Sequence, residues 1–222
     1  MLFTLVQEDR PRVQGYFTQS NLGTLQGVTL PTSYVDAMLT TPPPPADLAQ
    51  LERTGQDAHW HVPSLPHSSF RKALQHVQFH VPKKASDPSF VDQWIRFRPG
   101  GSQFTPFPHE AIGYVVDMFP LIIEQYPQIQ EDEVARKQVR WYPTVALNLD
   151  VKKRLPVEGV KWLFVRARAG KIENGRMDLQ VVVLDESREL VAVSSHVTLV
   201  MSAARNTAGR KRPGKTEGSN KL

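Results

Sequence analysis

The chain has 222 residues, of which 40% are hydrophobic and 22% are charged, a composition typical of a folded domain and not of a disordered chain. It contains no cysteine, which excludes disulfides, cysteine-based metal sites and a thiol nucleophile. The net charge of +5 arises wholly beyond residue 204, so the rest of the chain lacks the basic excess of a nucleic-acid-binding domain.

The first third of the chain predicts a hairpin followed by a connection. Residues 2–7 and 13–20 alternate as short strands do, and the stretch Glu8–Arg12 between them has turn chemistry. We expect residues 36–66 to form a linker, because Pro42–Pro45 is a stiff extended run and only residues 46–53 suggest helical turns. The sequence thus divides into residues 1–35, this Pro-rich linker, a main domain at 67–204 and a disordered basic tail at 205–222.

The main domain predicts an α+β fold. Residues 76–81 and 90–98 alternate as strands, and residues 109–126 predict a helix that is apolar around most of its circumference and therefore buried. Pro120 predicts a kink or an end in that helix. Four further strands are expected at 144–151, 162–169, 176–184 and 190–201. We therefore expect a curved antiparallel sheet around one long central helix.

Several motifs carry a family resemblance over about residues 70–201. These are Trp162-Leu163-Phe164, Gly175-Arg176, Leu184-Asp185 and the run Leu190–His196. Together they resemble the C-terminal hotdog of acyl-CoA thioesterase II-type double-hotdog proteins and, more narrowly, fungal thioesterase-like proteins. The resemblance implies a hotdog fold, with residues 1–35 as the remnant strands of a first hotdog. The sheet edge left open by that loss predicts a homo-oligomer, such as a dimer.

The same resemblance implies hydrolysis of acyl-CoA or related acyl and polyketide thioesters, without a metal or a cofactor. The family's catalytic positions fall on Asn148, Gly170 and His196, and Asp117 matches a helix aspartate of the family. Asparagine is no general base, so two arrangements stay open. Either His196 is the base and Asn148 polarises the carbonyl, or Asp150 is the base and Asn148 orients it.

Other positions suggest contacts with coenzyme A, and each has a plainer alternative. Lys152 and Arg166 would meet its phosphates, with Asp150 and Gly170 nearby, although such charges more often form solvent-exposed stripes. Asp117 would line the acyl site or simply bond to a neighbouring strand. Two other functions remain open: a dehydratase or cyclase of secondary metabolism that uses His196 with Asp117, and an inactive acyl-binding scaffold.

The sequence also bears on location. No apolar run reaches the ~18 residues of a membrane-spanning helix. The absence of cysteine fits a reducing compartment, so we expect the cytoplasm. The last three residues, Asn220-Lys221-Leu222, weakly resemble a peroxisomal targeting signal, which makes the peroxisome the alternative.

Overall fold

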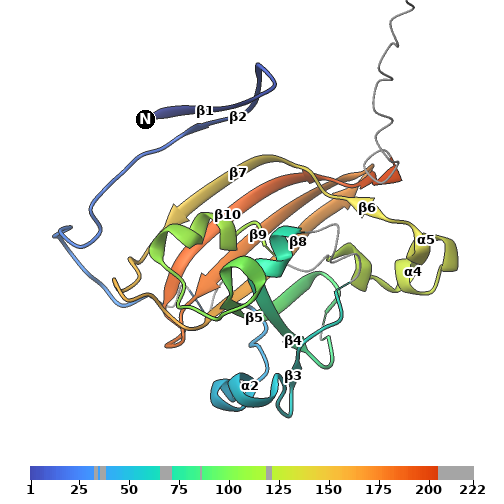
Figure 1. Cartoon of the computed structure of the whole chain (residues 1–222), viewed down its shortest axis with the longest axis horizontal. Helices are drawn as coiled ribbons and strands as arrows, with labels where there is room; N and C mark the ends of the chain where they lie inside the picture. Colours follow the sequence, from blue (N-terminus) through green and yellow to red (C-terminus); the bar gives the residue numbers. More distant parts are fainter. Residues whose placement is uncertain (33–34, 36–38, 66–71, 86, 119–121, 205–222) are drawn as a thin grey trace, which may run out of the picture.

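The computed structural model describes residues 1–32, 35, 39–65, 72–85, 87–118 and 122–204. The expected tail at 205–222 and its terminal Asn220-Lys221-Leu222 lie outside these residues, as does Pro120. Figure 1 shows one large curved sheet with short helices along its concave side and a small hairpin standing apart. The hairpin consists of β1 (Leu2–Gln7) and β2 (Arg10–Tyr16).

The large sheet has seven strands in the order β3-β4-β5-β8-β9-β10-β7, and every neighbouring pair is antiparallel. The predicted antiparallel sheet is therefore confirmed, with β7 and β9 at their expected bounds. Its strands are β3 (Trp60–His61), β4 (Val77–Pro82), β5 (Phe90–Phe97), β7 (Thr144–Val151), β8 (Leu163–Glu173), β9 (Arg176–Leu184) and β10 (Leu190–Leu199).

The expected long helix is replaced by short helical segments. A 3-10 turn (His109–Ala111) leads directly into α3 (Ile112–Val115), and the chain turns at Val116 and Asp117. The prediction of one helix over 109–126 was too long, since the helical run ends at Val115, five residues before Pro120. The remaining segments are the 3-10 helices Lys72–His76, Pro99–Gly101 and Ile123–Gln125, the helices α4 (Pro127–Gln130) and α5 (Glu133–Lys137), and the short strand pair β6 (Arg140–Trp141) with β11 (Met201–Ser202).

The sheet has two covered faces. The inner face packs against α3, and alternate residues of the central strands meet it in one apolar cluster that includes Ile95, Val165 and Val181. The outer face carries a second cluster, in which Trp94, Phe164 and Leu184 pack with residues from the preceding part of the chain: Leu39, Leu51 and Trp60.

The segment expected as a linker thus belongs to this domain. Leu51 lies on α2 (Leu48–Thr54), which begins at an Asp47 cap and ends at Gly55 with a positive φ of 74°. Trp60 is fully buried, and its Nε1 donates to Pro45 O at 3.0 Å. Residues 39–61, with Pro42–Pro45 extended, therefore run along the outer face as a covering strip. Burial of side chains such as Leu51 and Trp60 stabilises this packing.

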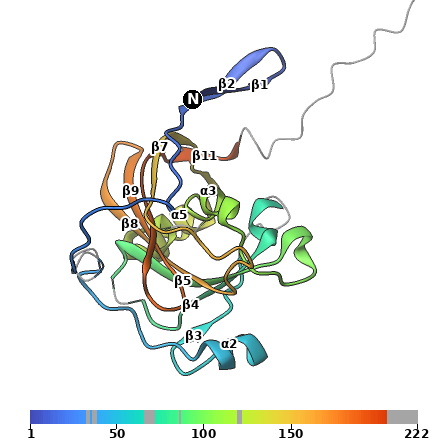
Figure 2. The ribbon, with the colours of Figure 1, turned by 90° about the vertical axis from the view of Figure 1, so that its left-hand side faces the viewer.

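The hairpin lies at the opposite end of the molecule from α2 in both views (Figures 1 and 2). Its turn is Glu8-Asp9, both at positive φ (53° and 57°), so β2 begins at residue 10 and not at 13 as expected. Most of its side chains are exposed, Tyr16 and Leu2 among them. Its origin as a remnant of a first hotdog stays a prediction.

Candidate functional site

Asp117 and His196 lie next to each other between the end of α3 and the inner face of the sheet. The distance from His196 Nδ1 to Asp117 Oδ1 is 3.6 Å. The His196 side chain has no exposed surface, whereas the Asp117 side chain is 51% exposed. Of the three residues expected to be catalytic, the structure brings these two side chains together.

The other ring nitrogen of His196 contacts its own strand. His196 Nε2 lies 2.9 Å from Ser194 Oγ, and Ser194 Oγ donates to Asn148 O at 2.8 Å. Burial lowers the pKa of His196 below its ordinary value, and the nearby charge of Asp117 opposes this shift in part. A polar group of the site therefore lies near each nitrogen of the imidazole, the serine hydroxyl at Nε2 and the carboxylate at Nδ1.

A cavity of about 490 Å³ lies beside this pair. Asp117 and Thr198 line it, and Thr144 Oγ1, also in the wall, donates to Asp117 Oδ1 at 3.1 Å. Thr198 is 3% exposed, and no residue in the described part of the chain hydrogen-bonds its Oγ1. The remaining walls are mostly apolar and comprise Ala73, Leu74, Met118, Ile122, Trp141, Met177 and Leu179, with Lys72 also in the lining.

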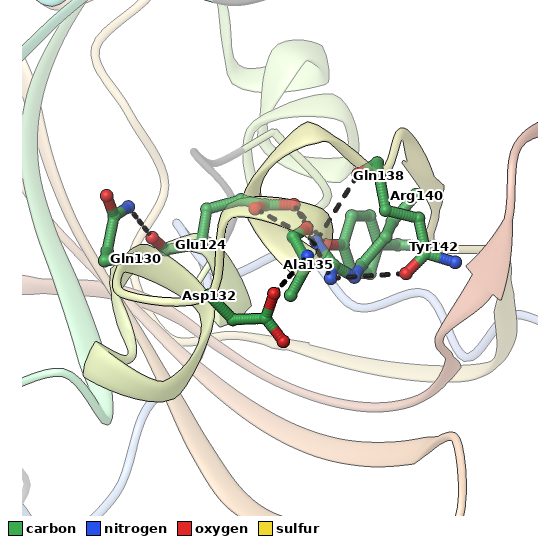
Figure 3. Close-up of polar contacts among 7 residues, drawn as sticks. All are labelled: Glu124, Gln130, Asp132, Ala135, Gln138, Arg140 and Tyr142. Carbon is green, nitrogen blue, oxygen red and sulfur yellow. Dashed lines mark hydrogen bonds and ion pairs between the residues drawn. The ribbon is translucent and has the colours of Figure 1, made fainter.

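Arg140 and Tyr142 form a second polar part of the cavity wall. Figure 3 shows both side chains meeting Glu124: Tyr142 OH donates to Glu124 Oε1 at 2.8 Å, and Arg140 Nη1 lies 3.3 Å from Glu124 Oε2. Arg140 Nη2 also donates to Ala135 O at 2.8 Å, in the middle of α5. This network ties the α4–α5 segment to the cavity.

Asn148 does not bring its side chain to the site. Asn148 pairs with Ser195 across β7 and β10, and His196 pairs with Leu147. Paired residues project to the same face, so the Asn148 side chain lies on the outer face and only its carbonyl reaches Ser194. Asp150 is on that outer face too, so neither expected arrangement with an Asn148 amide or an Asp150 base fits this geometry. The alternation of Val145, Leu147, Leu149 and Val151 was the signal for this orientation.

Arg166 is occupied by a buried ion pair. Its Nε and Nη2 each donate to an oxygen of Asp92 at 2.6 Å, its Nη1 donates to Thr41 O, and both side chains are 3% exposed. Burial raises the pKa of Asp92, and Arg166 opposes that shift. In this arrangement the guanidinium has no surface to offer a phosphate, which corrects the expectation of a coenzyme A contact.

The two remaining expected binding residues lie apart from the cavity. Lys152 forms an exposed ion pair with Asp150. Gly170 is exposed on β8, beside Asp178 O of the neighbouring strand. A role for either residue in coenzyme A binding stays a prediction.

Sequence reasoning did not identify Ser194, Thr198 and Thr144. Ser194, His196 and Thr198 are alternate residues of β10 and share the inner face, whereas Val193 and Val197 face outward. A strand that turns polar residues inward and apolar residues outward breaks the usual pattern, and this inversion was the available signal.

Known proteins resemble this chain in both sequence and fold. The family model "Acyl-CoA thioesterase C-terminal domain" matches residues 42–200. The thioesterase-like protein TwmA of Talaromyces wortmannii is 34% identical over 233 residues, which cover 94% of this chain and 64% of TwmA. A solved protein of unknown function with a hot dog fold, from Alicyclobacillus acidocaldarius, is similar with a TM-score of 0.53 and 16% identity, covering 90% of this chain and 66% of that one. The predicted hotdog fold is therefore confirmed.

Proposed function

The chain belongs to the acyl-CoA thioesterase C-terminal domain family, and from that premise we propose that it hydrolyses acyl thioesters. The acyl group would occupy the 490 Å³ cavity, with Asp117 at the reacting carbonyl. One observation supports this most: a half-exposed carboxylate lies in the wall of an otherwise largely apolar cavity, with a buried imidazole directly behind it.

The proposed chemistry needs one base and one donor. Asp117 takes a proton from water as the water oxygen bonds to the thioester carbon, and Thr198 Oγ1 donates a hydrogen bond to the carbonyl oxygen as negative charge develops there. The C–S bond then breaks, and the leaving sulfur takes the proton from the Asp117 carboxyl group. His196 acts through Asp117, because its side chain has no exposed surface.

The lining supports an acyl chain that carries oxygen. Met177, Leu179 and Ile122 offer apolar contact, while Arg140 and Tyr142 place N–H and O–H groups in the same wall. The proton of Tyr142 already goes to Glu124, so a hydroxyl of a polyketide-like chain would donate to the Tyr142 oxygen, and a carbonyl would accept from an N–H of Arg140 that is not bonded to Glu124 or Ala135. The carrier thiol, coenzyme A or a related pantetheine, would remain outside the cavity.

We also propose a homo-oligomer, on the evidence of an open sheet edge. β7 ends the strand order and so pairs on one side alone within the described sheet, and its Val145 is 62% exposed. Such an edge is a template for pairing with another strand. Light scattering after size exclusion would test this, and a monomer at micromolar concentration would contradict it.

Within the described ranges, no helix is long and apolar enough to cross a membrane.

The Asp117–His196 pair also favours a second candidate, proton-transfer chemistry such as dehydration or cyclisation next to a carbonyl. A carboxylate coupled to an imidazole can remove and return a proton without water as a nucleophile. Under this alternative, substrate would be consumed without thiol release.

The test is thiol release from a panel of short, long and oxygenated acyl-CoAs, measured on protein shown to be folded by circular dichroism. Asp117→Asn should lower the rate by about 10²–10⁴-fold, the usual contribution of a general base. Asp150→Asn, the same change on the outer face, should leave it unaltered. Release that survives Asp117→Asn would keep hydrolysis and overturn this base. No release from folded wild-type protein would overturn hydrolysis and leave the proton-transfer and scaffold functions.

A further inference from the structure

Ser194 is placed to decide which nitrogen of His196 carries a proton. We propose that Ser194 is a positioning residue that holds neutral His196 with its proton on Nε2, so that Nδ1, facing Asp117, is the atom that takes up and releases a proton. This inference deepens the hydrolysis proposed above, and its catalytic consequence rests on that function.

The argument begins with the single proton of the serine hydroxyl. Ser194 Oγ lies 2.8 Å from Asn148 O, and a carbonyl oxygen accepts but never donates. The hydroxyl proton therefore points at Asn148 O. Ser194 Oγ is then the acceptor in its 2.9 Å contact with His196 Nε2, so Nε2 must donate.

The position of Asn148 keeps this arrangement in place. Its carbonyl belongs to the backbone of β7, where Asn148 pairs with Ser195 of β10, so it is fixed by the sheet and not by a rotatable side chain. Ser194 is itself buried, with 6% of its surface exposed, so water does not compete readily for its hydroxyl. The backbone thus dictates the direction of the hydroxyl, and the hydroxyl dictates the tautomer.

The consequence falls on Asp117. A proton added to neutral His196 goes to Nδ1, which lies 3.6 Å from Asp117 Oδ1. His196 has no exposed side-chain surface, while Asp117 is half-exposed and lines the cavity. The proton of the imidazole therefore exchanges with the cavity by way of the carboxylate, which gives Asp117 a buried acid–base partner.

The tautomer can be read without any catalysis. Long-range ¹H–¹⁵N spectra of ¹⁵N-histidine-labelled protein, recorded where His196 is neutral, should show a protonated Nε2 and an unprotonated Nδ1. In Ser194→Ala, Nε2 loses its acceptor, whereas a proton on Nδ1 gains a carboxylate, so the proton should move to Nδ1. Ser195→Ala, a change on the outer face, should leave the tautomer of His196 unchanged. The tautomer of His80, a buried histidine far from Ser194, should also be the same in every variant.

The outcomes separate this inference from the proposed function. If the wild-type protein carries the proton of His196 on Nδ1, the inference is wrong. It is also wrong if folded Ser194→Ala keeps the wild-type tautomer. The wild-type spectrum alone tests the inference if Ser194→Ala does not fold. With an active enzyme, Ser194→Ala should lower kcat about tenfold with little change in KM, the effect of one hydrogen bond acting on the chemical step. The expected tautomer in a protein that releases no thiol would support the Ser194 role and reject hydrolysis alone.

Discussion

Two buried histidines lie on opposite faces of the same sheet and illustrate what each face does. His80, on the outer face, packs against Trp162 with ring centroids 5.0 Å apart. His196, on the inner face, meets a serine hydroxyl and a carboxylate beside a cavity. Burial lowers the pKa of both.

The difference lies in their surroundings and not in their burial. Around His80 the outer face is sealed by Trp60, Trp94 and their apolar neighbours, and its buried charges are paired with each other. Around His196 the inner face carries the hydroxyl groups of Ser194 and Thr198 and a half-exposed acid beside its apolar core. We infer that changes on the outer face affect folding, whereas changes around the inner cavity affect chemistry.

The largest expected effect is on the outer face. Arg166→Leu leaves the Asp92 carboxylate buried without its partner, so the free energy of unfolding should fall by about 3–5 kcal/mol. Chemical denaturation followed by circular dichroism measures this. Asp92→Leu combined with Arg166→Leu should recover much of the loss, because no lone charge remains buried. A single variant as stable as the wild type would contradict this assignment.

The next largest effect should come from His80, in the pH dependence of the free energy of unfolding. Burial lowers the pKa of His80 from 6.5 to about 4, with Arg96 adding to the shift. As the pH falls from 6.5 to about 4, His80 is protonated in the unfolded chain but stays neutral in the folded one. The free energy of unfolding therefore has its full His80 contribution above pH 6.5 and decreases as the pH falls toward 4. The loss should be about 3 kcal/mol. His80→Phe should flatten this part of the curve, and an equally steep decline in that variant would refute the assignment.

A third prediction concerns Thr198 on the inner face, where a substitution should affect activity more than stability. Thr198→Val keeps the shape but removes the hydroxyl, so kcat/KM should fall about tenfold as one hydrogen bond to the carbonyl is lost. Stability should hold or rise slightly, because the described structure pairs that buried oxygen with nothing. Thr198→Ser should retain activity. A loss of stability with unchanged kcat/KM would reverse the roles assigned to the two faces.

The smallest effect should come from Lys152, whose ion pair with Asp150 is exposed to solvent. Lys152→Met should change the free energy of unfolding by less than about 1 kcal/mol. The KM for an acyl-CoA, compared with that for the same acyl group on pantetheine, tests the earlier expectation of a phosphate contact. A rise in KM confined to the coenzyme A substrate would restore that contact.

The fold could be predicted from the sequence because its strands alternate locally. β7 and β9 have their expected bounds, since apolar residues recur every second position and Asn174-Gly175 marks the turn before β9. The packing of residues 39–61 on the sheet could not be predicted in this way. That segment shows no period, and its place is set by tertiary contacts of Leu51 and Trp60 with strands far along the chain.

The site could be predicted only in part for a similar reason. Asp117 stood out as a charge in an apolar stretch, whereas His196 was assigned by its family position. Asn148 was assigned by family position, although its apolar neighbours on β7 pointed inward and left it facing out. Ser194 gains its meaning from a carbonyl on another strand, a contact that no local pattern contains.

The strip that covers the outer face also sets an order of assembly. Arg166 bonds to Thr41 O, a residue 125 positions earlier in the chain. During synthesis this covering strip leaves the ribosome before β8, the strand that it covers, has been made. Its apolar side chains therefore stay unpacked until β8 is available. Long-range closures of this kind fold slowly, so the outer face should be completed late, while newly made Trp60 and Leu51 are still exposed to chaperones.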